Sequence, residues 1–280
     1  MGDIIVINDD SKESLHAAKY AFNLACVYNK NIVLANVISS KPTVLESLAR
    51  AKPVPSGFQV MLADEEGAEN LADHLNCLKS GSGFTPGIKT LDATGYGERE
   101  LISYVNIQKT WMIVRGAAND SAILRITLRL NMQTVLNRVQ CPILMVPESA
   151  EPAALERLVY LADLRYAQIP VINYLAKLHN ANESVILAHI CANGLPELDK
   201  SYASDLFSNG LSRNVVGGNL FFTQLKKKHF PEVIDTAIHG LQGDMLICSN
   251  HSYHFEQLFG STFNNTIPVY VPVPILVFPC

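Results

Sequence analysis

The sequence predicts an α/β protein made of two tandem domains, each with a five-stranded parallel sheet and flanking helices. The first observation is a repeat: an apolar strand, a polar loop, a helical segment and a second apolar strand lie between Trp111 and Pro147 and recur between Asp244 and Pro279. A duplicated domain is the economical explanation. The second is the length of 280 residues, which suits about two domains of roughly 150 residues each. The third is the alternation of strands and helices, which is typical of parallel sheets with right-handed crossovers.

The first half begins with the apolar run Ile4–Asn8, which is typical of a strand buried on both faces. Ser11 can cap the next helix, and Asn29 marks its end. The apolar face of that helix is expected to contain Leu15, Ala18, Phe22 and Ala25. Strands are then expected at 32–37, 88–93, 111–114 and 142–147, and helices at 64–79 and 98–108, with an irregular excursion in between.

The second half restarts the same order after a short polar stretch at 148–152, which we expect to link the two domains. The predicted domains are residues 1–149 and 153–280. Strands are expected at 158–163, 185–190, 219–224, 245–247 and 274–279, and helices at 169–179 and 231–239, with an irregular middle and a polar loop from Ser249 to Ser252.

Composition restricts the class of protein. Hydrophobic residues make up 48% and charged residues 17%, which favours a globular protein. The net charge of −4 gives no reason to expect nucleic acid or an anionic membrane as the main partner. The N-terminus lacks the pattern of a signal peptide, and the longest apolar run, 270–280, is far shorter than the ~20 residues of a spanning helix. Six cysteines without paired spacing favour a reducing compartment, so a cytoplasmic location is expected.

Three features carry a family resemblance. An acid closes the first strand of each half (Asp9 or Asp10, and Asp163), the second strand of the later half ends in Ala188-His189-Ile190, and Pro-Ile-Leu strands begin at 142 and 274. In these features the chain resembles the universal stress protein family in its tandem form. The resemblance implies flavodoxin-like or Rossmann-like five-stranded domains and, as in many members, ATP binding. It also implies that the fifth strands pair the two domains as a pseudo-dimer, with a homodimer also possible.

The nucleotide signature of the family has two glycines shortly after strand four and a later Gly followed by Ser or Thr. Such glycines let the backbone approach phosphates, and a helix start then holds the anion. In the first half Gly116 matches the first glycine, but Asn119 and Arg129 fall on the other two glycine positions. With Asp9 and Asp10, these residues form a degenerate first-domain site in which we expect no tight ATP binding.

The second half departs from the signature differently. Ser249 and Ser252 fall where the first glycines belong, Gly260-Ser261 keeps the later pair, and Thr262 follows. The segment 253–261 is similar to a variant in tandem members from Bacteroidetes, in which glycines are lost. Ser261 and Thr262 can be simple helix caps, or they can belong to a remaining nucleotide or anion site. The candidate site contains Asp163, His189, Ser249, Ser252, Gly260, Ser261 and Thr262.

Other residue patterns point to weaker alternatives. Cys248, His251 and His254 are ligand types suited to zinc, but a fourth ligand is missing, so no metal site is predicted. Asp163 and Arg165 are interpreted as a local surface pair. The sequence shows no Gly-x-Ser-x-Gly elbow and no Walker loop, and Asp9 and Asp10 are interpreted as one cap of the first helix and one crevice residue.

These observations predict a non-enzymatic cytoplasmic stress-response protein that acts through ligand or partner binding and has degenerate nucleotide sites. No cofactor is certain, and ATP or AMP is the one that the resemblance implies. The alternative is an ATP-binding switch or weak ATPase that uses the second domain. A metal-dependent regulator that uses Cys248, His251 and His254 is a third possibility. The expected partners include a small nucleotide but neither nucleic acid nor a membrane.

Overall fold

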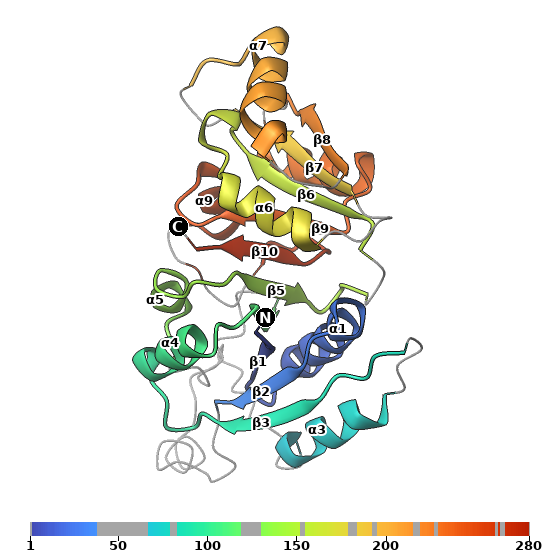
Figure 1. Ribbon diagram of the computed structural model, residues 1–280, viewed down its shortest axis with the longest axis vertical. Coiled ribbons are helices and arrows are strands. Elements are labelled where there is room, and N and C mark those ends of the chain that lie inside the picture. The colour runs from blue at the N-terminus through green and yellow to red at the C-terminus, as the bar shows by residue number, and fades with distance from the viewer. Residues whose placement is uncertain are drawn as a thin grey trace, which may run out of the picture. The chain divides into compact units, whose positions relative to one another are not determined.

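The computed structural model describes residues 2–37, 67–78, 83–118, 130–151, 155–178, 184–191, 195–214, 219–226, 229–260, 263 and 267–279. The chain divides into two compact units. The first comprises Met1–Glu148 with Asn264–Ile267, and the second comprises Ser149–Phe263 with Pro268–Cys280. Figure 1 shows the alternation of strands and helices along the chain, from blue to red.

The first unit contains a parallel sheet in the order β3-β2-β1-β4-β5. This is the order of a Rossmann-type sheet, in which the direction of winding reverses between the first and fourth strands. Nearly every residue of β1, β4 and β5 is buried, which explains why they are continuous apolar runs in the sequence. The strands are β1 (Ile4–Asn8), β2 (Ile32–Asn36), β3 (Ile88–Asp92), β4 (Met112–Ala117) and β5 (Ile143–Pro147).

The described helices of the first unit are α1 (Lys12–Tyr28), α3 (Gly67–Cys77), α4 (Glu98–Ile107) and α5 (Met132–Leu136). Ser11 caps α1, as predicted, because its side chain accepts a hydrogen bond from the Ser14 amide. The helix ends at Asn29, in the left-handed region with φ 52°. The predicted apolar face is wrong at Leu15, which is 37% exposed, whereas Ala18, Phe22 and Ala25 are buried.

Strand β4 is longer than predicted. The sequence predicts a strand that ends at Val114 and then a polar loop. In the structure Arg115, Gly116 and Ala117 continue the ladder with β5, opposite Met145, Val146 and Pro147. A backbone that pairs on one edge can accommodate a polar or small residue without leaving the sheet. Residue composition alone therefore predicts an end of the strand that is too early. Arg115 is consequently buried, with 2% of its surface exposed.

Helices α1 and α4 cover opposite faces of this sheet. Gly116 contacts α1, while Tyr104 of α4 lies over Ile5. Ile5 pairs with Ile113 in the parallel register, and Gly116 lies three residues farther along the same strand. Because side chains alternate along a strand, Ile113 and Gly116 face opposite sides.

The second unit repeats the topology, with strands in the order β10-β9-β6-β7-β8 and parallel pairing throughout. Strand for strand this is the order of the first unit, so the predicted α/β fold with parallel five-stranded sheets is confirmed. The strands are β6 (Arg157–Ala162), β7 (Ser184–His189), β8 (Asn219–Gln224), β9 (Met245–Ser249) and β10 (Ile275–Phe278).

The helical segments of the second unit include α7 with its continuation η2, which lies in the middle of the second half, where the sequence predicts irregular structure. The residues buried in it are Ala203 and Leu211, so it has no long apolar stripe to reveal a helical period. The segments are η1 (Leu164–Tyr166), α6 (Ile169–Leu178), α7 (Lys200–Asp205), η2 (Leu206–Leu211), η3 (Ser212–Asn214), α8 (Phe230–Asp235), η4 (Thr236–Gly240) and α9 (Tyr253–Phe259).

Two further observations concern the class of protein. Within the described ranges, no helix is both long enough and apolar enough to cross a membrane. Five described cysteines are free thiols: Cys26, Cys77, Cys141, Cys191 and Cys248. Of these, only Cys141 and Cys248 are buried.

Candidate functional site

The predicted second-domain residues lie at the carboxyl ends of three adjacent strands. Asp163 follows β6, His189 ends β7 and Ser249 ends β9, and β6 lies between the other two. The winding direction of the sheet reverses between β6 and β9, and open α/β sheets bind ligands at such a point, outside the carboxyl edge. The structure therefore brings Asp163, His189 and Ser249 to the edge where a ligand site is expected.

The carboxylate of Asp163 is held by Arg165. Oδ1 accepts from Arg165 Nε at 2.8 Å and from its backbone amide at 3.1 Å, and Oδ2 accepts from Nη2 at 2.5 Å. Asp163 is 3% exposed and Arg165 is 21% exposed. The interpretation as a surface pair is therefore wrong, because the carboxylate is buried. Such a two-pronged contact satisfies a buried carboxylate and fixes its orientation.

The guanidinium of Arg165 also has partners outside this pair. Nη1 donates to the carbonyl oxygen of Pro196 at 3.1 Å, and Nη2 lies 3.2 Å from Sγ of Cys191. The hydrogen bonds to Asp163 raise the pKa of Arg165 above its usual value. Arg165 is thus a fixed cation attached to the segment that follows β7.

His189 is a completely buried imidazole at the end of β7. Its Nδ1 accepts from the Leu164 amide at 3.2 Å, which assigns the ring proton to Nε2, and Nδ1 lies 4.0 Å from Asp163 Oδ1. Burial lowers the pKa of His189, while the Asp163 charge acts in the opposite direction. Nε2 has no hydrogen-bond partner among the described residues, so this ring carries one buried, unsatisfied donor.

His254 is a second buried imidazole in the same unit. Its Nε2 donates to the carbonyl oxygen of Ile190, directly after β7, at 3.1 Å. Burial lowers the pKa of His254 to about 4, with the hydrogen bond to Ile190 opposing the shift. His254 therefore joins α9 to the end of β7 as a neutral ring.

The serines of the predicted site have local structural partners. Ser249, which was predicted to begin a loop, is the last residue of β9 and lies 3.0 Å from the hydroxyl of Tyr160. Ser252 caps α9 by accepting from the Phe255 amide at 3.1 Å. Gly260 ends α9 with φ 70°, a conformation that favours glycine. Ser261 and Thr262 lie outside the described residues.

Tyr160 is a member of this cluster that sequence reasoning missed. It sits inside the apolar run of β6 and is 1% exposed. The signal was present in the sequence, since a buried tyrosine hydroxyl requires a hydrogen-bond partner and so marks a polar group near the core.

In the first unit, Asp9 and Asp10 lie in the turn that follows β1. Asp9 Oδ1 accepts from the Ser11 amide at 3.2 Å, and Asp10 Oδ1 accepts from the Asn8 side chain at 3.1 Å. Burial raises the pKa of Asp10, and the charge of Asp9 adds to this effect. The prediction that one of the two acids caps α1 is wrong, because Ser11 is the cap and both acids bond within the turn.

Gly116, the residue aligned with the first phosphate glycine, lies inside β4 against the start of α1. A Cβ at this position would come within 2.3 Å of the carbonyl carbon and oxygen of Glu13. The missing side chain therefore lets helix and strand approach each other, and the space beside Gly116 is filled by the protein itself. Asn119 and Arg129 lie outside the described residues.

The three candidate metal ligands lie in different environments. Cys248 is buried within β9, where burial raises the pKa of its thiol. His251 is exposed in a turn with φ 57°, and His254 bonds to Ile190. Across the described part of the chain, no group of three His, Cys, Asp or Glu side chains could hold a metal ion, so these three residues are not assembled.

Comparisons with known proteins agree with this fold. A model of the universal stress protein family matches residues 1–147. Universal stress protein MJ0531 of Methanocaldococcus jannaschii is 26% identical over 145 residues, which cover 51% of this chain and 80% of that protein. The crystal structure of a universal stress protein from Archaeoglobus fulgidus is similar with a TM-score of 0.58 and 13% identity, over 99% of this chain and 97% of that one. The family model covers more than half of the sequence, and the chain belongs to the universal stress protein family.

Proposed function

We propose that the protein is a non-enzymatic, cytoplasmic stress-response protein that acts by binding a ligand or partner, and that both of its nucleotide sites are degenerate. Membership of the family supports the general class. Adenine nucleotide is the ligand that the family resemblance implies for the carboxyl edges of the two sheets. Whether the protein binds it depends on how well these edges can accommodate phosphates.

The observation that carries the proposal is the position of Gly116. A phosphate-binding glycine leaves open space where its backbone meets the anion. Here the side-chain position of Gly116 is filled by the backbone of Glu13, itself 6% exposed. The glycine thus serves helix packing, and the carboxylates of Asp9 and Asp10 beside the first turn of α1 would repel a phosphate.

The second unit supports the proposal in a different way. Asp163 is paired with Arg165, Ser249 with Tyr160, and Ser252 with the first turn of α9. A nucleotide would have to replace these internal contacts, each of which satisfies a buried or partly buried polar group. The alternative, an ATP-binding switch in this unit, would use the same carboxyl edge, but the unpartnered Nε2 of His189 is fully buried and would have to be uncovered before it could bind a nucleotide.

Isothermal titration calorimetry with ATP and Mg²⁺ separates the two functions. We expect no binding tighter than ~10 μM, an affinity that corresponds to about 7 kcal/mol and requires a formed phosphate grip. Phosphate release measured over several hours should match a protein-free blank. Tighter binding that is lost in His189→Ala would establish the switch instead, with the exposed His251→Asn as the matched control.

The expectations on location and partners belong to the same proposal. The net charge of −4 supports partners other than nucleic acid and anionic membranes. Fractionation of cells that express the full chain should place it in the cytosolic fraction, and light scattering should establish whether it forms a homodimer.

A further inference from the structure

The outer strand of the second unit, β8, has one open edge. It pairs with β7 along its whole length, and no described strand pairs with its other edge. Such an edge leaves a row of backbone N–H and C=O groups without partners and can pair with a strand of another molecule. The backbone groups and side chains of β8 determine which strand fits there.

The backbone groups on this edge can be identified from the register with β7. The Leu225 amide donates to the carbonyl oxygen of His189 at 2.9 Å. Because backbone groups alternate along a strand, Phe221 and Thr223 also direct their N–H and C=O groups at β7, and the residues between them direct theirs outward. The outward residues are Leu220, Phe222 and Gln224. None of their main-chain groups on this edge has a hydrogen-bond partner within the part of the chain that the structure describes.

The residues of β8 are uncharged and include no proline. Phe221, Phe222 and Thr223 are aromatic or β-branched, and such residues favour strands. Phe222 is covered on its own face, since its ring stacks on Phe207 of η2 with the centroids 5.4 Å apart. Phe221 points to the other face and is 55% exposed. β8 therefore presents an exposed aromatic ring beside an open edge, without the charges or prolines that usually protect edge strands.

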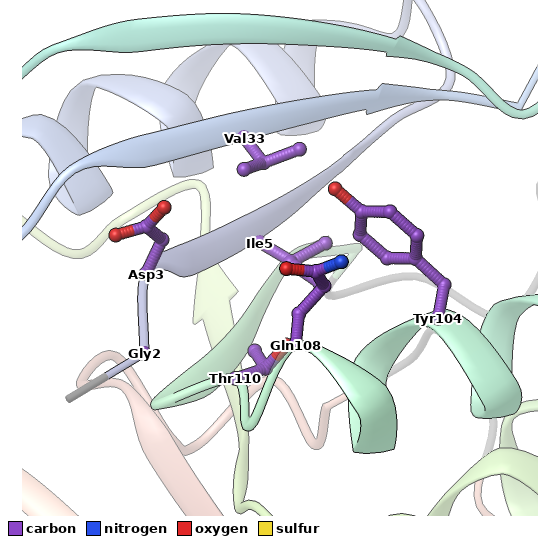
Figure 2. Close-up of a pocket in the computed structure, with 7 residues that line it drawn as sticks. All are labelled: Gly2, Asp3, Ile5, Val33, Tyr104, Gln108 and Thr110. Carbon is purple, nitrogen blue, oxygen red and sulfur yellow. The ribbon is translucent and has the colours of Figure 1, made fainter.

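The corresponding strand of the first unit is protected. β3 is the outer strand of that sheet, next to β2 and then β1, which carry Val33 and Ile5 in Figure 2. It contains Lys89 and Asp92, and both are exposed. Charged side chains on an edge strand oppose pairing with another strand, because pairing would remove water from the charges. The two units share one topology, so this is a difference between strands at equivalent positions.

A second copy of β8 fits the open edge in antiparallel orientation. A two-fold axis at Phe222 places this residue opposite Phe222 of the second copy, and the amides of Leu220 and Gln224 then meet carbonyl oxygens of the second copy. On the exposed face, Phe221 lies opposite Thr223 of the second copy, and an aromatic residue beside a β-branched one stabilises a sheet. Every outward amide of β8 thus gains an acceptor.

The charge next to β8 favours this orientation. Lys226 follows the strand, is 51% exposed and lies 2.7 Å from Glu197. Antiparallel pairing about Phe222 keeps the Lys226 side chains of the two copies at opposite ends, about 27 Å apart at roughly 3.4 Å per residue. This separation exceeds the ~8 Å over which exposed charges interact at physiological salt. Parallel pairing in register would place the two lysines about 5 Å apart.

From the open edge, the exposed Phe221 and the uncharged strand we propose that β8 is a docking surface for a second copy of this chain, and that the two β8 strands pair antiparallel about Phe222. A single pair of short strands buries less than the ~1,200 Å² of standard interfaces, so the dimer is reversible, with a Kd on the order of 100 μM. The inference does not depend on the proposed function, since it uses none of the candidate nucleotide-site residues.

The test is analytical ultracentrifugation of the full chain together with NMR measurement of amide exchange with solvent. We expect monomers at about 5 μM and mostly dimers at about 1 mM, tenfold above the expected Kd. Over the same range, exchange of the outward amides of Leu220, Phe222 and Gln224 should slow severalfold, while the Thr223 amide, which does not face the second copy, keeps its rate. A monomer at about 1 mM, or outward amides whose exchange is independent of concentration, would overturn the proposal.

Variants test the register of the two strands. Phe221→Lys should weaken dimerisation about tenfold, because it removes the aromatic pair and adds like charges to both copies. Thr223→Glu added to the same chain should restore it, since positions 221 and 223 of the two copies face each other. Ile107→Lys, at a residue 73% exposed on α4, is the matched control and should leave dimerisation unchanged. Dimerisation unaffected by Phe221→Lys, or a double variant no better than Phe221→Lys alone, would refute this pairing.

Discussion

Gly116 of β4 lies directly against Glu13 at the start of α1, so that an added Cβ would overlap the carbonyl group of Glu13 at 2.3 Å. The atoms in the way belong to the backbone of a 17-residue helix, which cannot move as a flexible side chain could. This contact fixes the distance between the helix and the centre of the first sheet.

Gly116→Ala is therefore expected to destabilise the protein by about 3 kcal/mol, the upper end of the usual cost of overpacking a close-packed interior. Urea denaturation followed by circular dichroism measures the change. Gly95→Ala is the matched control, because nothing lies within 4 Å of its Cβ position. Equal stability of the two variants would show that α1 can shift away from β4.

Removing Arg165 should expose the dependence of the second unit on its buried ion pair. Arg165→Ala leaves the carboxylate of Asp163 without its principal partner at 3% exposure, and we expect a loss of about 2 kcal/mol at neutral pH. Lys226→Ala serves as the control. Its partner Glu197 is 59% exposed, and surface pairs of this kind contribute little. An equally small loss of stability in both variants would mean that water can replace the guanidinium as the hydrogen-bond partner of Asp163.

The free energy of unfolding should decrease as the pH is lowered from about 6.5 to 4. His254 is buried as a neutral ring, and its pKa drops from 6.5 in the unfolded chain to about 4. In that window the unfolded state binds a proton that the folded state does not, so acid favours unfolding, by up to about 3 kcal/mol. His189 contributes in the same direction, because burial lowers its pKa too.

His254→Gln tests the assignment of this pH dependence, since its amide can still donate to the Ile190 carbonyl but does not titrate. Urea midpoints measured from pH 7.5 to pH 4.5 should show a flatter profile for this variant than for the unmodified protein. His251→Asn, at an exposed turn position with positive φ, should keep the original profile. A profile unaltered by His254→Gln would assign the acid sensitivity to other groups.

Tyr160 and Ser249 should be energetically coupled across β6 and β9. Their hydroxyls are 3.0 Å apart in a buried setting, and Tyr160→Phe should cost about 1 kcal/mol by leaving Ser249 without that partner. The double variant with Ser249→Ala should cost less than the sum of the two single changes, by about 0.5–1 kcal/mol. Strict additivity in denaturation experiments would show that the two groups act independently.

The local pattern of the sequence was sufficient for most of the fold. Ile4–Asn8, Ile32–Asn36 and Ile143–Pro147 are continuous apolar runs because strands of a doubly covered sheet are buried on both faces. The helix α7 was missed because its buried residues are too few to show a period. Likewise, the predicted end of β4, before Arg115, is too early, since a buried arginine within a strand cannot be distinguished from a loop residue by composition.

The candidate site was predictable in its location but not in its contacts. Asp163, His189 and Ser249 could be placed at one edge because parallel strands align their carboxyl ends. Their partners could not be predicted, since Tyr160 and His254 approach from separate elements only after the sheet and helices have packed.

The sequence by itself thus determined the repeated α/β architecture, through the spacing of apolar runs and caps that act over a few residues. Only the tertiary structure decided that Gly116 serves helix packing and that Asp163 is bound by Arg165. The physical reason is the range of the interactions: secondary structure follows from neighbours along the chain, whereas the role of a side chain follows from the atoms that folding brings against it.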